Sequence, residues 1–167
     1  QFAEYPLESV PMNIETTSSS PLTSGHPDPD STAKGLLSLG RKQSILLAED
    51  DHSSKWALKR LLETDGYRVE AVEDGSELLY ELEPVILREP GIRPPDLIVT
   101  DVRMPGINVF NVIEQLRDNG YEIPVIIMTG YGSDRIRHRV NQIGRAFYFE
   151  KPIDIGELEA TLERALS

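Results

Sequence analysis

The chain alternates between short apolar runs and segments with the spacing of an amphipathic helix. Four of the runs are continuous, at residues 45–48, 97–99, 125–128 and 146–149. Continuous apolar runs of this length are typical of strands buried on both faces. A fifth run, at residues 67–72, alternates apolar and polar side chains, as an edge strand with one face in water does. This order predicts an α/β fold in which helices cover both faces of a parallel sheet.

Four of the helical segments carry a stripe of apolar residues on one face. The stripes are Leu58, Leu61 and Leu62; Val109, Val112, Ile113 and Leu116; Ile136, Val140 and Ile143; and Ile155, Leu158 and Leu162. A shorter helix is predicted at residues 76–82. Residues 84–95 contain four prolines, which predicts an unusually long connection before the third strand.

The first 44 residues differ in composition from the rest of the chain. Five are proline and twelve are serine or threonine, so this segment has little apolar surface to bury. Such a segment does not offset the entropy lost when its backbone is ordered. We therefore expect residues 1–44 to be a disordered tail or an interdomain linker, and residues 45–167 to form one domain.

The composition argues against several classes of function. Lys and Arg number 17 against 28 Asp and Glu, and the resulting net charge of −11 makes nucleic acid an unfavourable partner. Cysteine is absent, which excludes disulfides, cysteine zinc sites and thiol nucleophiles. The sequence contains neither an apolar run long enough to cross a bilayer nor a signal-peptide pattern, so we expect a cytoplasmic protein without a membrane partner.

Polar residues follow the predicted strands at the edge where parallel sheets bind ligands. They are Glu49, Asp50, Asp51, Asp101, Thr129 and Lys151. Carboxylates that converge on one place repel one another unless a cation lies among them. A set of oxygen ligands without His or Cys suits Mg²⁺, with Mn²⁺ as the alternative ion.

Each of these residues also has a purely structural interpretation. Asp51 is well placed to cap the helix that follows it. Asp101 can be a turn residue, and Lys151 can be one more solvated lysine. The convergence of all of them at one edge of the sheet favours a functional site.

Over about residues 45–166 the sequence resembles the receiver domain of bacterial two-component response regulators. Five ordered segments carry the resemblance: ILLAEDD, GYRVEAVEDGSELL, PDLIVTDVRMPG, IPVIIMTGYG and FYFEKPID. The resemblance implies a flavodoxin-like (βα)5 fold, a three-layer sandwich around a five-stranded parallel sheet of order 2-1-3-4-5. It also implies a phosphorylation-dependent switch. Its phosphoryl donor is a sensor histidine kinase or a histidine phosphotransfer protein, and its output is a protein target or a covalent domain outside this chain.

The same resemblance implies roles for eight residues. They are Asp101 as phosphoacceptor; Asp50, Asp51, Asp101 and the backbone carbonyl of Arg103 as metal ligands; Thr129 and Lys151 as phosphoryl-binding groups; Thr129 and Tyr148 as the switch; and Lys151 with Pro152 as a cis peptide. The resemblance implies a phosphoacceptor that phosphorylates itself and dephosphorylates slowly, and no other enzymatic activity.

The sequence departs from the family pattern at two places. Asn108 and Val109 stand where an Asp–Gly pair usually begins the third helix, and residues 144–147 lack the acidic residues that usually follow Gly-Ala. The second departure argues against a dimer held by charged pairs across the output face, so we expect at most a weak homodimer. Arg135, Arg137 and Arg139, on the helix predicted at 134–142, form either a solvated face or a docking surface for an acidic partner.

Other functions of the same fold stay open or are disfavoured. One alternative is the C-terminal receiver of a hybrid histidine kinase. Another, less favoured, is a pseudo-receiver that binds partners without phosphate. A flavin carrier is disfavoured because Asp50 and Asp51 would repel the flavin phosphate. An aspartyl-phosphate hydrolase is disfavoured because its nucleophile usually lies on the first strand, whereas Asp101 ends the third.

Overall fold

The computed structural model describes residues 41–167, and these residues form five strands and five helices in strict alternation. In chain order the elements are β1 (Ser44–Ala48), α2 (His52–Thr64), β2 (Arg68–Val72), α3 (Gly75–Ile86), β3 (Leu97–Asp101), α4 (Val109–Asp118), β4 (Val125–Thr129), α5 (Asp134–Ile143), β5 (Ala146–Glu150) and α6 (Ile155–Leu166). The tail or linker predicted at residues 1–44 lies outside the described residues except for its last four.

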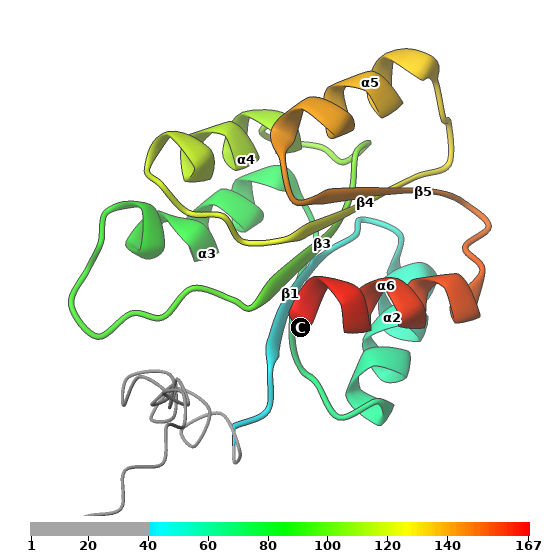
Figure 1. Ribbon diagram of the computed structural model, residues 1–167, viewed down its shortest axis with the longest axis horizontal. Coiled ribbons are helices and arrows are strands. Elements are labelled where there is room, and N and C mark those ends of the chain that lie inside the picture. Colours follow the sequence, from blue (N-terminus) through cyan, green and yellow to red (C-terminus); the bar gives the residue numbers. More distant parts are fainter. Residues whose placement is uncertain (1–40) are drawn as a thin grey trace, which may run out of the picture. The chain divides into compact units, whose positions relative to one another are not determined.

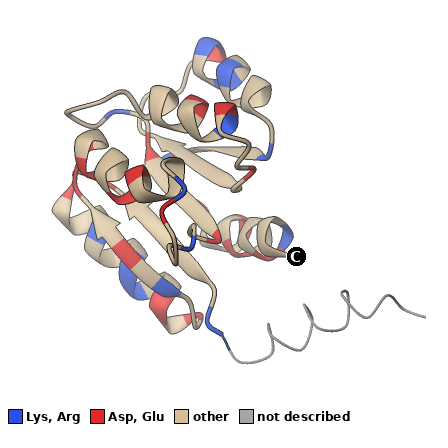
Figure 2. Ribbon diagram, turned by 90° about the vertical axis from the view of Figure 1, so that its left-hand side faces the viewer, with Lys and Arg blue, Asp and Glu red and all other residues tan. Residues whose placement is uncertain are grey.

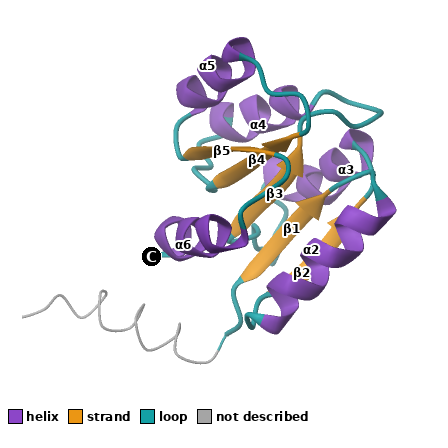
Figure 3. Cartoon of the chain, turned by 90° about the vertical axis from the view of Figure 1, so that its right-hand side faces the viewer, coloured by secondary structure: helices purple, strands orange, loops and turns teal. Residues whose placement is uncertain are grey.

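All five strands lie in one parallel sheet with the order β2-β1-β3-β4-β5 (Figures 1 and 3). This order and the alternating helices define a flavodoxin-like α/β fold, which confirms the predicted fold class. Because the strands are parallel, the residues that end β1, β3, β4 and β5 share one edge of the sheet.

The sheet separates two hydrophobic cores. Helices α3, α4 and α5 cover one face, and α2 and α6 cover the other (Figure 3). Leu46 of β1 points into the first core, whereas Ile45 and Leu47 point into the second. Since both sides of β1, β3 and β4 are covered, all their residues are buried, which explains their continuous apolar runs.

Two predicted elements differ from those observed. β5 was expected to be buried on both faces, but it is an edge strand, and Ala146, Phe147 and Tyr148 are only half-buried. α3 is longer than the predicted 76–82, because Val85 extends its buried face beyond Leu82.

Pro84 therefore lies inside α3 and not in the connection that follows. Near the end of a helix, a proline removes only one backbone hydrogen bond, and the Pro84 carbonyl still accepts a hydrogen bond from the Glu89 N–H at 2.9 Å. The long connection before β3 is thus residues 87–96. None of the helices in the described part of the chain has the length and apolar character needed to cross a lipid bilayer.

Candidate functional site

Three carboxylates from two adjacent strands meet at the carboxyl edge of the sheet. One oxygen from each of Glu49, Asp50 and Asp101 lies within 4.8 Å of the others. Glu49 and Asp101 are buried, with 1% and 6% of their surface exposed, whereas Asp50 is exposed. The neighbouring positions of β1 and β3 bring the residues at their ends together.

Lys151, directly after β5, bridges the two buried carboxylates. Its Nζ donates to Glu49 Oε2 at 2.6 Å and to Asp101 Oδ2 at 2.5 Å. Its backbone N–H donates to the Thr129 carbonyl at 2.9 Å, which fixes the start of the β5–α6 loop against β4. The Lys151–Pro152 peptide bond is cis, the isomer that the family resemblance implies.

The charges at this site do not balance. Burial raises the pKa of Glu49, and the Lys151 ammonium only partly offsets this effect. Burial also opposes the charge on Lys151, but hydrogen bonds to Asp101 and Glu49 outweigh it and raise the pKa of Lys151. The formal charges of three carboxylates and one ammonium sum to −2. A divalent ion with a preference for oxygen ligands, such as Mg²⁺, would neutralise this excess.

Asp51 lies outside this cluster. Its side chain accepts a hydrogen bond from the Ser54 N–H at 2.8 Å and caps α2, and this bond lowers the pKa of Asp51. The structure thus brings Glu49, and not Asp51, together with Asp50 and Asp101. The sequence did contain a clue, because Glu49 directly follows a fully buried strand, whereas Asp51 stands next to the helix start.

Backbone contacts of the loop after β3 orient the Asp101 carboxylate. The Arg103 N–H donates to Asp101 Oδ1 at 2.7 Å, which leaves Oδ2 for Lys151. The Arg103 guanidinium lies 4.7 Å from the centre of the Tyr131 ring, so side chains from the β3 and β4 loops contact each other beside the site. The role of the Arg103 carbonyl as a metal ligand stays a prediction.

The two predicted switch residues lie on neighbouring strands. Thr129 ends β4 and is fully buried, and its hydroxyl accepts a hydrogen bond from the Tyr131 N–H at 3.2 Å. Tyr148 is half-buried on β5, and its hydroxyl donates to Glu150 Oε1 at 2.8 Å. Burial and this bond to Glu150 raise the pKa of Tyr148, and the same bond lowers the pKa of Glu150.

The arginines of α5, the uppermost helix in Figure 2, have different partners. Arg137 donates to Glu150 Oε1 at 3.0 Å and lies 4.9 Å from the centre of the Tyr148 ring. Arg139 donates to Glu114 at 2.8 Å. Arg135 is exposed and forms no ion pair within residues 41–167. Among these three arginines of α5, only Arg135 therefore lacks an ion-pair partner in the described part of the chain, and Arg137 contacts both Tyr148 and Glu150.

A sequence model of the response regulator receiver domain matches residues 45–163. The chain belongs to the response regulator receiver family. The receiver is 32% identical over 123 residues to the DNA-binding transcriptional regulator NtrC of Escherichia coli (strain K12), which covers 74% of this chain and 24% of NtrC. It is 33% identical over 122 residues to the response regulator MprA of Mycolicibacterium vanbaalenii. This match covers 73% of this chain and 49% of MprA. The chain thus spans about a quarter of NtrC and about half of MprA.

Solved receiver domains have the same fold. The non-phosphorylated HemR receiver domain from Leptospira biflexa is 34% identical, with a TM-score of 0.62 over 75% of this chain and 95% of HemR. The receiver domain of the hybrid histidine kinase CckA is 28% identical, with a TM-score of 0.56 over 74% of this chain and 99% of that domain. The receiver fold and its acidic cluster make this chain a signalling module of two-component type.

Proposed function

We propose that this receiver accepts a phosphoryl group on Asp101 in a Mg²⁺-dependent reaction, and that the modification changes a surface read by a partner. The donor is a histidine kinase or a histidine phosphotransfer protein. The observation that carries the proposal is the Lys151 bridge between Glu49 and Asp101, beside a third carboxylate. That arrangement places a nucleophile, a cation and an oxygen-ligand set within one small volume.

The metal ligands in this proposal are Glu49, Asp50, Asp101 and the backbone carbonyl of Arg103. Asp51 keeps its place as the cap of α2, where its carboxylate is already used. When bound, Mg²⁺ supplies positive charge against the oxygens of the phosphoryl group. The protein contributes the fixed positions of the carboxylates, because Glu49 and Asp101 are buried and hydrogen-bonded.

In the transfer, an Asp101 carboxylate oxygen attacks the phosphorus of a phosphohistidine. A P–O bond forms, the P–N bond breaks, and its electron pair leaves with the imidazole nitrogen, which takes a proton from water. The Lys151 ammonium shifts from Asp101 to the phosphoryl oxygens, and its bond to Glu49 keeps it at the site. The Arg103 N–H continues to orient the phosphorylated Asp101.

The switch starts from the hydroxyl of Thr129. The acyl phosphate carries about two negative charges on its phosphoryl oxygens, and these oxygens attract this hydroxyl as a donor. As Thr129 turns toward the phosphoryl group, it leaves space beneath β5. Tyr148 then breaks its hydrogen bond to Glu150, and its ring turns into that space. Arg137 then loses its contact with the Tyr148 ring and no longer shares Glu150 with the Tyr148 hydroxyl, so the surface of α5 and β5 changes.

The output of this change is a partner protein or a domain joined to the receiver. NtrC is a DNA-binding transcriptional regulator, and its length beyond the matched region leaves room for such a domain. The similarity to the CckA receiver supports a second context, the receiver of a hybrid histidine kinase. Both contexts require the same chemistry at Asp101.

Incubation with Mg²⁺ and acetyl phosphate tests the proposal. Intact mass spectrometry should show one added phosphoryl group that is labile to hydroxylamine, and Asp101→Asn should abolish it. Glu49→Gln should weaken Mg²⁺ binding by at least about tenfold, because it removes a charged ligand. Asp51→Asn is the matched control, since asparagine also caps helices and metal binding should stay close to that of the native chain. No adduct on the native chain, or the same adduct on Asp101→Asn, would refute the proposal.

A further inference from the structure

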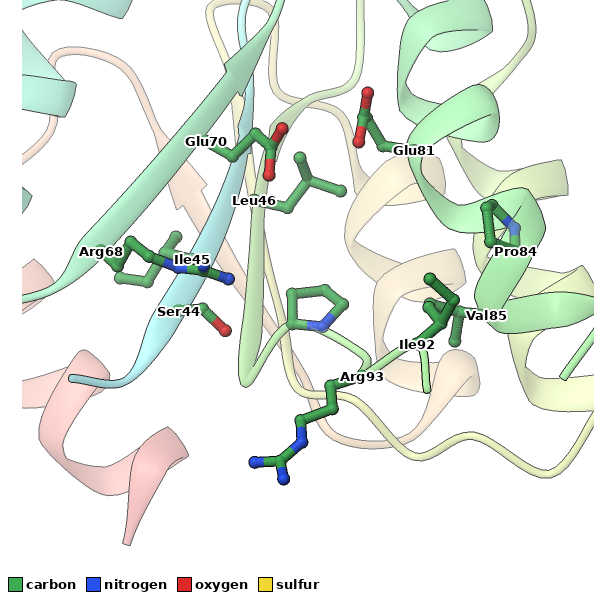
Figure 4. A pocket seen from close by; sticks show the side chains of 11 residues that line it. Ser44, Ile45, Leu46, Arg68, Glu70, Glu81, Pro84, Val85, Ile92 and Arg93 are labelled. Atoms are coloured by element: carbon green, nitrogen blue, oxygen red, sulfur yellow. The ribbon is translucent and has the colours of Figure 1, made fainter. Parts of the chain in front are cut away.

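A hollow lies on the α3 side of the sheet, beneath the long connection at residues 87–96. It is formed by β1, β2, α3 and this connection, and its volume is about 210 Å³ (Figure 4). Leu46, Val85 and Ile92 supply apolar walls, and Ile92 is 47% exposed.

Basic residues surround the outer end of this hollow. A second hollow of about 400 Å³ continues from the first, since Ser44, Arg68 and Arg93 line both, and Arg41 and Lys42 line its far side. Arg41, Lys42 and Arg68 lie at the amino-terminal ends of β1 and β2, and Arg93 lies in the connection before β3, so this mouth is at the opposite edge of the sheet from Asp101.

The cations at this mouth are poorly compensated. Arg41 pairs with Asp96 at 2.5 Å, but Lys42, Arg68 and Arg93 form no ion pair with any residue that the structure describes. Cations around one solvent-filled space repel one another, and an anion bound between them relieves the repulsion.

The other end of the hollow is acidic. Glu70 from β2 and Glu81 from α3 lie on either side of it (Figure 4). Ionised carboxylates only accept hydrogen bonds, so they call for N–H or O–H donors on a ligand. The apolar walls next to them suit a flat, weakly polar body.

The connection that closes the hollow is fixed to the sheet. Asp96 accepts hydrogen bonds from the Ser44 backbone N–H at 2.7 Å and from the Ser44 hydroxyl at 3.0 Å. The Arg41 guanidinium holds the other oxygen of Asp96. These bonds anchor the end of the connection beside Pro95, which lines the hollow.

We propose that this hollow binds a nucleotide. Its phosphate lies between Arg68 and Arg93, and its base lies against Val85 and Ile92 with an exocyclic amino group donating to Glu70 or Glu81. A nucleotide carries all three chemical groups that the hollow calls for: a phosphate for the basic end, a flat base for the apolar walls and N–H donors for the two glutamates. The site is independent of Asp101 and adds a second input to the receiver.

Calorimetric titration of the full chain in EDTA and low salt, without Mg²⁺, tests the site. GMP, AMP and CMP should each bind at least about tenfold more tightly than inorganic phosphate. UMP lacks an exocyclic amino group and should bind about tenfold more weakly than CMP. Asp101→Asn should bind all of them as the native chain does, so this test does not depend on phosphorylation.

Substitutions locate the two ends of the ligand. Arg93→Ala should weaken every phosphate-bearing ligand by about tenfold, and the double variant Glu70→Ala/Glu81→Ala should remove the difference between CMP and UMP. Arg135→Ala is the matched control, because it removes one exposed, unpaired cation from α5. Equal affinity for inorganic phosphate and the nucleotides, no nucleotide binding at millimolar concentration, or equal losses in Arg93→Ala and Arg135→Ala would each overturn the proposal.

Discussion

Lys151→Met should destabilise the receiver, because it leaves Glu49 and Asp101 as buried carboxylates without a cation. The side chains of Glu49 and Asp101 are only 1% and 8% exposed, and that of Lys151 is 24% exposed. Removing one partner of a buried ion pair costs about 3–5 kcal/mol. Since the Lys151 side chain is partly solvated and burial already favours a protonated Glu49, we expect the lower limit, about 3 kcal/mol. Methionine keeps most of the aliphatic volume of lysine, so the loss reports on charge.

Urea denaturation followed by circular dichroism in EDTA measures this loss. Millimolar Mg²⁺ should recover part of it, because a divalent ion can take over the role of the ammonium. Lys59→Met is the control. Lys59 pairs with Glu63 at 3.8 Å with both side chains about 40% exposed, and its loss should cost no more than about 0.5 kcal/mol.

A second substitution separates charge from packing. Asp101→Asn in the Lys151→Met background removes one of the two unpaired charges, so the double variant should be more stable than Lys151→Met alone. An unchanged free energy of unfolding in Lys151→Met, or a further loss in the double variant, would refute the view that Lys151 balances these carboxylates.

Three other substitutions test separate features. In Gly132→Ala the new Cβ would collide with the Tyr148 hydroxyl and with Glu150, so NMR should show the Tyr148 ring displaced without phosphorylation; a native ring position would contradict this. Arg137→Ala removes one of the two hydrogen bonds that lower the pKa of Glu150, so an NMR titration should move that pKa back toward 4.5. The stabilisation from Glu150 is present above pH 4.5 and is lost as the pH falls through the lowered value, and an unmoved pKa would disprove the contact. Pro84→Ala restores a helix N–H donor and should raise the free energy of unfolding by about 2 kcal/mol in urea, whereas a loss would show that the proline is needed in α3.

The fold could be predicted because a strand that is buried on both faces has a continuous run of apolar residues in the sequence. The runs at 45–48, 97–99 and 125–128 are continuous for that reason, and each became a buried central strand. β5 has an equally apolar run but lies at the edge of the sheet, and only the strand order, which local sequence does not encode, reveals this. The end of α3 was missed because Pro84 is a helix breaker in most contexts, and the burial of Val85 outweighs it.

The sequence predicts which edge of the sheet carries the site, but it does not predict every residue that serves as a metal ligand. Parallel strands bring Asp101 and Lys151 to one place whatever the details of the loops. Which acids of the Glu49–Asp51 run point into the site depends on where β1 ends and α2 begins. Since Asp51 bonds to the Ser54 N–H, the helix start decides its direction, and a one-residue change in that boundary would alter the ligand set.

β1 carries opposite charge at its two ends, with Ser44 among cations and Glu49 among carboxylates. Five residues of a strand span about 16 Å. That length is about twice the Debye length of ~8 Å at physiological ionic strength, so the two ends barely sense each other's charge through solvent. In low salt the receiver should behave as a dipole, and two copies should attract head to tail. At physiological salt, any effect of an anion at the Ser44 end on Asp101 must instead travel as a displacement of the buried strand itself.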